Sequence, residues 1–388
     1  MGGVLSDLCV LLCKSGCRPS AVASALSFFP PEPPFYSFAP YERERTRGGD
    51  VSSAAASSSQ VEISYKDAAA ETLSAKRAAG SPRPTKIPGP PSSGPLQLVL
   101  DEEIEGITPP LKALGRQTGE DSGPLSYTIQ TLKSRSGNIV ACMFLRHADA
   151  GGKCVIVSHG NATDCGAMWE RYMEICFRLK INVLGWDYSG YGMSTGTPTE
   201  ANTYKDIEAV YDFAVSNVVS NPAKELFLYG QSVGSGPSCK IAANRKRPIA
   251  GLILHSPIMS GIRVLTMNRG PLCCCDIFPN IDRIRLVRCP VFIIHGEEDE
   301  QVDFAHGRAL QDAVPEQFQT EPYWVKRAGH NDIVERNRSE FFRRLKRYFG
   351  VVEGYVGIDE AGNRKKSSRR VTDLSSQRDA SYEIVSQS

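Results

Sequence analysis

The sequence contains no run of about 18 apolar residues, which is the length that a transmembrane helix needs. Its best candidate, around Val10–Leu12, is bounded by Asp7 and Lys14. The chain also has no excess of one charge, because 45 Lys and Arg balance 43 Asp and Glu to a net charge of +2. Nucleic-acid-binding domains are usually strongly basic, so a nucleic-acid partner is not expected.

The cysteines are too few for a disulfide scaffold and lack the spacing of metal ligands. Twelve cysteines in 388 residues are too few for a disulfide scaffold, and none form a Cys-x-x-Cys pair or a Cys/His zinc pattern. No positive charge precedes the short apolar stretch near the amino terminus, so a secretory signal peptide is not expected. These absences predict a protein of a reducing, cytosolic environment that holds no metal ion.

Composition divides the chain into four parts. Residues 1–38 form a distinct amino-terminal segment, and residues 39–95 are rich in Ser, Ala, Pro and Gly, which predicts a disordered linker. Residues 96–350 contain the pattern of a folded domain. Residues 351–388 are polar, carry a basic cluster from Arg364 to Arg370, and are predicted to form a disordered tail.

Strand-length apolar runs alternate with helix-length segments from about Leu125 to Gly350. This alternation predicts an α/β fold with a mostly parallel central sheet flanked by helices. A turn at Ser136-Gly137 joins the first two runs and predicts an antiparallel start. The predicted strands are Tyr127–Leu132, Ile139–Leu145, Cys154–Ser158, Asn182–Trp186, Leu226–Tyr229, Gly251–His255, Val291–His295 and Tyr323–Val325. The predicted helices are Ala167–Leu179, Glu200–Val218, Gly236–Asn244, Ala305–Val314 and Ile333–Tyr348.

A Gly-x-Ser-x-Gly motif occupies residues 230–234, between a predicted strand and a predicted helix. This context is typical of a nucleophile elbow, in which a sharp turn holds the serine at the carboxyl edge of a sheet. Small residues are needed on both sides of the serine because the turn brings backbones together. We therefore predict that Ser232 is a nucleophile.

A serine hydroxyl is a poor nucleophile at neutral pH and needs a base that a carboxylate orients. In this type of fold the partners follow in the order Ser, acid, His. His330 comes just after the last predicted strand and is the predicted base. The acid should follow the preceding strand, where we favour Asp299 and keep Glu297, Glu298 and Asp303 as alternatives.

Two backbone N–H groups are expected to bind the oxyanion of an acyl-transfer intermediate. One belongs to Val233, directly after the nucleophile, and the other to Asn161 or, alternatively, Ala162 in the loop after Cys154–Ser158. We expect His159, in the same loop, to hydrogen-bond to backbone rather than act as a base. The Gly-rich residues 187–194 lack the Lys of a phosphate-binding loop and are interpreted as a turn at the rim of the site.

The amino terminus carries two signals for lipid attachment. It begins Met-Gly-Gly-Val-Leu-Ser, which matches the pattern for N-myristoylation at Gly2. Cys9, Cys13 and Cys17 are spaced by four, so a helix would place their thiols in one stripe, where S-acylation is expected. The alternative is a buried cysteine-containing helix. The run Cys273–Cys275 is interpreted as a loop or lid wall, and no role is assigned to it.

Several motifs together point to one family. They are the early cysteines followed by Phe28–Phe35, and the segments Ser158–Ala162, Asp187–Gly192, Tyr229–Gly234, His255–Pro257, Phe278–Ile281, Ile294–Gly296, Asp303–Phe304 and Gly329–Asp332. In these segments the chain resembles the α/β-hydrolase domain-containing 17 family, the membrane-anchored protein depalmitoylases. The resemblance implies the α/β-hydrolase fold, with Ser232 as nucleophile, Asp299 as acid, His330 as base and the three early cysteines as acylation sites.

The function that the resemblance implies is removal of palmitate from S-acylated cysteines through an acyl-enzyme, without a cofactor. The implied partners are palmitoylated membrane proteins as substrates and the lipid surface that the acyl anchors enter. The implied location is the cytoplasmic face of the plasma membrane or of endosomes. Two alternatives remain open: a lipid esterase or peptidase of the same fold, and a non-catalytic membrane-tethered scaffold.

Overall fold

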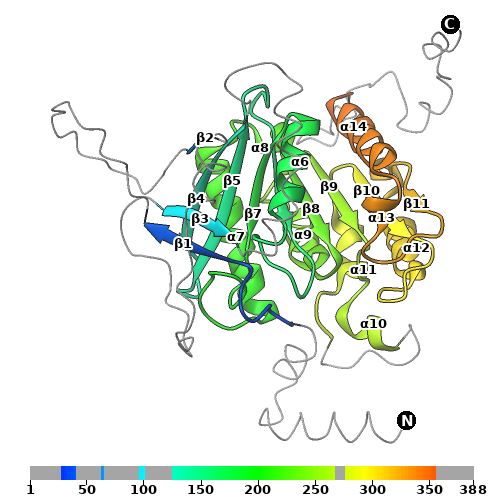
Figure 1. Ribbon diagram of the computed structural model, residues 1–388. Coiled ribbons are helices and arrows are strands. Elements are labelled where there is room, and N and C mark those ends of the chain that lie inside the picture. The colour runs from blue at the N-terminus through cyan, green and yellow to red at the C-terminus, as the bar shows by residue number, and fades with distance from the viewer. Residues whose placement is uncertain (1–27, 41–62, 65–95, 101–124, 267–275, 355–388) are drawn as a thin grey trace, which may run out of the picture.

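The computed structural model describes residues 28–40, 63–64, 96–100, 125–266 and 276–354 (Figure 1). The predictions for Gly2, Cys9, Cys13, Cys17, Cys273–Cys275 and the tail lie outside these residues. The linker prediction falls outside them except at residues 39–40 and 63–64.

A nine-stranded sheet forms the centre of the described chain, in the order β11-β10-β9-β8-β6-β7-β5-β4-β2. The strands are β2 (Ile63–Ser64), β4 (Leu125–Lys133), β5 (Ile139–His147), β6 (Cys154–Ser158), β7 (Asn182–Trp186), β8 (Leu226–Gln231), β9 (Gly251–His255), β10 (Val291–Gly296) and β11 (Tyr323–Val325). Neighbours from β7 to β11 run parallel, whereas β2, β4 and β5 pair antiparallel. The predicted α/β architecture with an antiparallel start is confirmed.

Helices cover both faces of the sheet (Figure 1). They are α6 (Trp169–Leu179), α7 (Glu200–Asn217), α8 (Pro222–Glu225), α9 (Ser235–Ala242), α10 (Gly261–Thr266), α11 (Asn280–Arg283), α12 (Phe304–Ala313), α13 (Ile333–Arg336) and α14 (Arg338–Gly354). Side chains alternate along each strand, so in β6 Cys154 and Ile156 join the core with α7 and α9, and Val155 and Val157 join the core with α6 and α14. A strand covered on both faces is apolar throughout, which is why short apolar runs marked the strands correctly.

One segment that was predicted to be a single helix forms two helices in the structure. Residues 333–348 were expected to form a single helix, but α13 ends at Arg336 and α14 begins at Arg338. Between them, the Asn337 side-chain oxygen accepts a hydrogen bond from the N–H of Glu340 at 3.0 Å. An asparagine in this position caps a helix amino terminus, so it starts a second helix rather than continuing the first.

The segment after the predicted lipidation sites packs on the folded domain. β1 (Tyr36–Pro40) pairs antiparallel with β3 (Leu96–Leu100) in a separate two-stranded sheet. Phe28 and Tyr36 are buried, each in one of the two cores that flank the nine-stranded sheet. Part of the amino-terminal segment 1–38 therefore contacts the folded domain directly.

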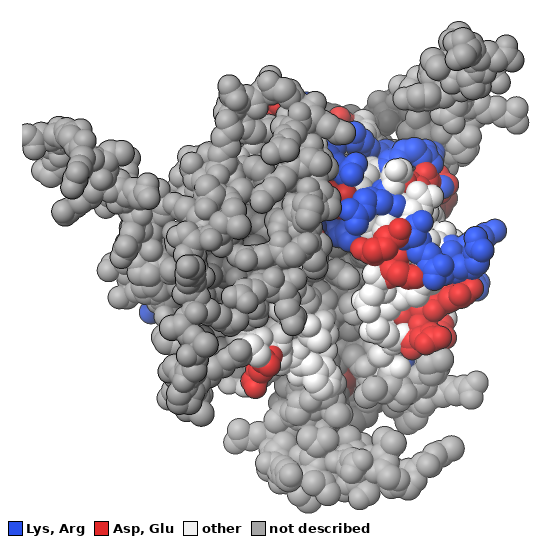
Figure 2. All heavy atoms as spheres, in the orientation of Figure 1, with Lys and Arg blue, Asp and Glu red and all other residues white. Residues whose placement is uncertain are grey.

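Surface charges on the face around α14 are interleaved by sign, as Figure 2 shows. Arg344 bonds to Glu321 at 2.9 Å, and Arg171 bonds to Glu335 at 2.7 Å. Such exposed pairs contribute about 0–1 kcal/mol each, so they neutralise the face more than they stabilise the fold. No helix within the described ranges has the length and apolar character that crossing a bilayer requires.

Candidate active site

Ser232 lies at the carboxyl end of β8, on a strained turn into α9. Its φ of 51° is in the left-handed region, which costs a non-glycine residue on the order of 1–3 kcal/mol. The flanking glycines are required sterically: a Cβ at Gly230 would lie 2.6 Å from the Gly234 oxygen, and one at Gly234 would lie 2.2 Å from the Ser158 oxygen. The turn therefore has the geometry of the predicted nucleophile elbow.

His330 links the serine to a carboxylate. Its Nε2 is 3.0 Å from the Ser232 hydroxyl oxygen, and its Nδ1 is 2.7 Å from Oδ2 of Asp299. Because an ionised carboxylate can only accept, Nδ1 carries the proton and Nε2 is free to take one from the serine. The structure thus brings together the three residues that the sequence singled out.

Asp299 is held ionised by its surroundings. Its Oδ1 accepts the N–H groups of Gln301 and Val302 at 2.9 and 2.8 Å, and its Oδ2 lies 3.2 Å from Nε2 of His295. Burial opposes ionisation, but hydrogen bonds from His295, His330 and Val302 hold the pKa of Asp299 below its ordinary value. A permanent negative charge beside Nδ1 is what stabilises the imidazolium during catalysis.

The alternative acids do not contact His330. Glu297 and Glu298 are exposed. Asp303 caps α12 instead, accepting the N–H of Ala305 at 2.7 Å. Asp299 is therefore the only one of the four candidates that the structure places against the histidine.

The loop after β6 passes beside the nucleophile. A Cβ placed on Gly160 would lie 3.9 Å from Cβ of Ser232, so the next residue, Asn161, is close to the reacting centre. Val233 is the second residue of the 3₁₀ turn η1 (Ser232–Gly234), and the first N–H groups of a helix lack intrahelical acceptors. This arrangement is compatible with N–H groups of Val233 and Asn161 facing the same oxyanion.

Two other histidines at this edge of the sheet have structural contacts. Nδ1 of His159 lies 2.7 Å from the Gly160 oxygen, so its ring does bond to backbone, as expected. His255 is buried, its Nδ1 lies 2.5 Å from the Tyr229 hydroxyl, and burial and the nearby His330 lower its pKa to about 3. Both rings are unsuited to be the general base.

Sequence reasoning missed the support around the site. His295, to which the sequence analysis gives no role, contacts the same carboxylate oxygen as His330. Tyr191, in the stretch interpreted as a rim turn, donates to the Asn161 side-chain oxygen at 2.6 Å. The position of His295, four residues before Asp299, could have indicated its contact with the acid. No local sequence pattern indicates the contact between Tyr191 and Asn161.

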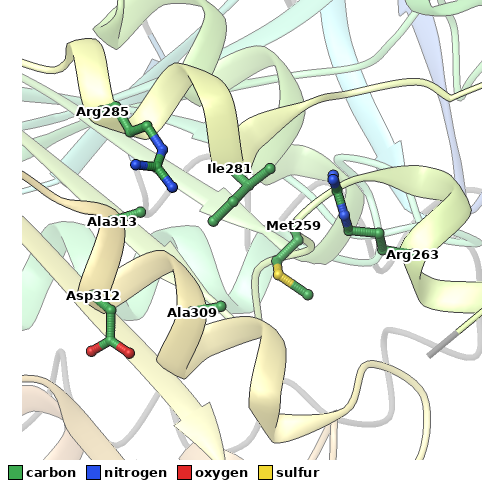
Figure 3. A pocket seen from close by; sticks show the side chains of 7 residues that line it. All are labelled: Met259, Arg263, Ile281, Arg285, Ala309, Asp312 and Ala313. Atoms are coloured by element: carbon green, nitrogen blue, oxygen red, sulfur yellow. The ribbon is translucent and has the colours of Figure 1, made fainter. Parts of the chain in front are cut away.

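A cavity of about 350 Å³ lies apart from these residues, between α10, α11 and α12. Figure 3 shows Met259 and Ile281 between Arg263 and Arg285, with Ala309, Asp312 and Ala313 on α12. None of the lining residues is a nucleophile or base that faces Ser232. Among the described residues, no group of His, Cys, Asp or Glu side chains is arranged to hold a metal ion.

The strand order, the elbow and the hydrogen-bonded Ser232, His330 and Asp299 define a serine hydrolase of the α/β-hydrolase fold. Residues 151–272 match the protein family described as "Serine aminopeptidase, S33", a match that includes Ser232 but ends before the acid and the base. Most of the chain is similar to α/β-hydrolase domain-containing protein 17C of Xenopus tropicalis, with 34% identity over 89% of this chain and 94% of that protein. The chain belongs to the α/β-hydrolase domain-containing protein 17 family.

Other relatives are more similar over a shorter part. Protein 17B of Homo sapiens is 42% identical over 56% of this chain and 73% of its own length, and aho-3 of Caenorhabditis elegans is 42% identical over 53% and 63%. Among solved structures, the Pyrococcus furiosus esterase Pf2001 shows 17% identity and a TM-score of 0.49, covering 58% of this chain and 91% of that one. The family assignment rests on the sequence relatives and not on this structural likeness.

Proposed function

We propose that this hydrolase cleaves the thioester that joins a palmitoyl group to a cysteine of a membrane-associated protein. The observation that carries the proposal is the continuous chain of contacts from Ser232 through His330 to Asp299, at 3.0 and 2.7 Å. Such a chain performs acyl transfer. The thioester preference is supported by the family resemblance and by the amino-terminal cysteines, which suit a membrane-bound enzyme.

The reaction would proceed in two steps. His330 takes the Ser232 proton as the serine oxygen attacks the thioester carbonyl, and N–H groups of Val233 and Asn161 stabilise the oxyanion. The carbon–sulfur bond breaks, the cysteine sulfur receives the proton from His330, and palmitoyl-Ser232 remains. Water then attacks this ester by the same route and releases palmitate.

Membrane attachment is part of the proposal. A myristoyl group at Gly2 gives only marginal binding, whereas further acyl chains on Cys9, Cys13 and Cys17 give stable attachment. Tethering would raise the effective concentration of S-palmitoylated substrate proteins at the cytoplasmic face of the plasma membrane or endosomes. Hydroxylamine-sensitive acyl labelling of wild type, and its loss with all three cysteines changed to Ser, tests this part separately.

The direct test is turnover of an S-palmitoyl cysteine peptide and its O-palmitoyl serine analogue by wild type and Ser232→Ala. We expect thioester hydrolysis by wild type and a loss of about 10⁴-fold or more in the variant. Ser216→Ala, an exposed serine on α7, is the matched control and should keep full activity. Equal thermal melting of the three proteins shows that the loss is chemical.

Other outcomes point to other functions. Turnover of the oxoester alone would overturn the proposal in favour of a lipid esterase. Cleavage of a peptide amide alone would favour the peptidase that the name of the matching family suggests. No turnover of any substrate on liposomes would leave a non-catalytic membrane-tethered protein.

A further inference from the structure

Residues 28–36, which we name the strap, lie across the loops beside the nucleophile. At one end the Phe28 ring is buried edge-on against Tyr191 and Phe278, with ring centroids 6.3 and 5.8 Å away. The next backbone N–H, that of Phe29, donates to the Asn161 side-chain oxygen at 2.9 Å and to the Tyr191 hydroxyl at 2.8 Å. The Phe29 ring itself is 54% exposed, so it is the backbone that is held here.

The other end of the strap is fixed as firmly. The N–H of Phe35 donates to Oδ2 of the buried Asp164 at 2.8 Å. The Tyr36 hydroxyl donates to Asp187 and accepts the N–H of Met193 at 3.2 Å. The Tyr36 ring is buried, so its contacts lie in the interior of the protein and not on its surface.

Two glycines leave the space that Tyr36 occupies. A Cβ on Gly166 would lie 2.8 Å from Cβ of Tyr36, and a Cβ on Gly192 would lie 2.9 Å from Cε1 of the same ring. Neither distance is compatible with a side chain. The loops after β6 and β7 are therefore shaped to receive the strap.

The loop that the strap holds is the one that carries Asn161. The Asn161 side-chain oxygen accepts hydrogen bonds from the Phe29 N–H, the Tyr191 hydroxyl and the Ala162 N–H. Ala162 has a φ of 53°, a strained value for alanine. Strained backbone persists only where surrounding contacts fix it, and the strap and Tyr191 supply such contacts.

We propose that the strap and Tyr191 are positioning elements of the oxyanion hole, which hold Asn161 so that its backbone N–H is preorganised for the tetrahedral intermediate. This proposal rests on the acyl-transfer chemistry proposed above, but not on which acyl group is removed. Oxyanion donors act through fixed geometry, and a displacement of about 1 Å can cost about 10²-fold in rate. The strap should therefore affect kcat far more than KM.

The test uses the full chain and p-nitrophenyl butyrate, a soluble ester that needs no membrane. Tyr191→Phe removes only the hydroxyl that donates to Asn161, and should lower kcat by about tenfold with KM within about twofold. Phe28→Ala should lower kcat by about 10–100-fold, and Phe28→Leu should recover part of it by refilling the buried site. Rates are expressed per active serine, titrated with a fluorophosphonate, so that unfolded protein does not count.

The matched control is Tyr211→Phe. Tyr211 is also buried and donates its hydroxyl to a backbone oxygen, that of Pro248 at 2.8 Å, but it lies on α7. It should lose stability without losing kcat per site. If Tyr191→Phe and Phe28→Ala keep wild-type kcat per site, or lose no more than Tyr211→Phe, the strap is merely structural and the proposal is wrong. If wild type hydrolyses the thioester peptide but not this ester, the same variants are compared on the thioester. If it hydrolyses neither, the proposed function fails first and the strap proposal falls with it.

Discussion

Two buried histidine–carboxylate pairs lie at the carboxyl edge of the same sheet. In one, Nδ1 of His330 lies 2.7 Å from Asp299, and in the other, Nε2 of His159 lies 3.2 Å from Asp187. All four residues are buried. A search for buried histidine–acid pairs alone would return both as candidate catalytic dyads.

The pairs differ in what the second ring nitrogen contacts. Nε2 of His330 faces the Ser232 hydroxyl at 3.0 Å, whereas Nδ1 of His159 is committed to the Gly160 carbonyl at 2.7 Å. A carbonyl oxygen can only accept, so that nitrogen of His159 carries a proton and cannot receive one. The base is therefore identified by its second nitrogen and not by its carboxylate.

The largest expected effect comes from changing the two histidines in parallel. His330→Gln should lower kcat by about 10⁵–10⁶-fold, because the serine then has no base. His159→Gln should lower the free energy of unfolding by about 2–4 kcal/mol, since its ring packs 4.3 Å from that of Tyr188, and reduce kcat by at most about 10²-fold. Ester hydrolysis per titrated serine and urea unfolding measure the two quantities.

These two variants test whether the second ring nitrogen distinguishes the catalytic pair from the structural pair. If His159→Gln abolishes turnover in folded protein as fully as His330→Gln does, the second ring nitrogen is not what separates the pairs. A stability loss without a comparable rate loss would establish His159 as a structural residue.

The carboxylates of the two pairs should differ in their effect on kcat as the two histidines do, but by a smaller factor. Asp299→Asn should lower kcat by about 10⁴-fold, because an amide can donate to Nδ1 and favour the wrong tautomer of His330. Asp187→Asn keeps the shape of a side chain that bonds to Tyr36 and to the N–H of Cys165 at 2.9 Å. Its main effect should be lower stability, measured by urea unfolding beside steady-state kinetics. A loss of 10⁴-fold in both variants would contradict this assignment.

A third histidine, His295, contacts the catalytic pair through Asp299. Nε2 of His295 lies 2.8 Å from the Val302 oxygen and 3.2 Å from Asp299, so this fully buried ring orients the acid. His295→Leu should lower kcat by about tenfold, with KM unchanged, and His295→Gln should recover part of the rate by restoring a donor. Equal kcat in wild type and His295→Leu would show that Gln301 and Val302 suffice to hold Asp299.

Sequence alone predicted the residues whose roles follow from chain order. Ser232, Asp299 and His330 each follow a strand of a parallel sheet, and the carboxyl ends of such strands meet at one edge. Asp299 could not be separated from its acidic neighbours, because that choice depends on which carboxylate turns inward. The break at Asn337 was missed because the apolar periodicity continues from α13 into α14.

The strap was beyond sequence reasoning for a different reason. Its hydrogen bonds join residues 129–162 positions apart and use the backbone N–H groups of Phe29 and Phe35, which every non-proline residue possesses. No residue pattern encodes such contacts. Phe28 and Tyr36 could only have been suspected as apolar side chains in a part of the chain that otherwise offers little core.

The smallest effect concerns two carboxyl groups whose pKa values move in opposite directions. Burial, then the nearby Asp187, raises the pKa of Asp164 to about 6, whereas Asp299 is held below its ordinary value. Between about pH 4 and 6 the folded chain keeps the Asp164 proton that the unfolded chain loses, so this group makes unfolding more costly as the pH falls from about 7 to 4. Asp299 works the other way: its contribution is present above about pH 4 and disappears only below that range.

Asp164→Asn removes the first contribution and leaves the second. A shift of about two pKa units corresponds to about 3 kcal/mol at most, and loss of one acceptor for Phe35 or Ala167 adds a pH-independent cost. The difference in free energy of unfolding between wild type and Asp164→Asn, from urea titrations at pH 4.5 and 7, should therefore be larger at pH 4.5. Other buried groups, such as His255, titrate in both proteins, so their contributions to the free energy of unfolding cancel in this difference. If the difference is the same at both pH values, the Asp164 carboxyl is already ionised in the fold, and the strap binds to a charged loop rather than a neutral one.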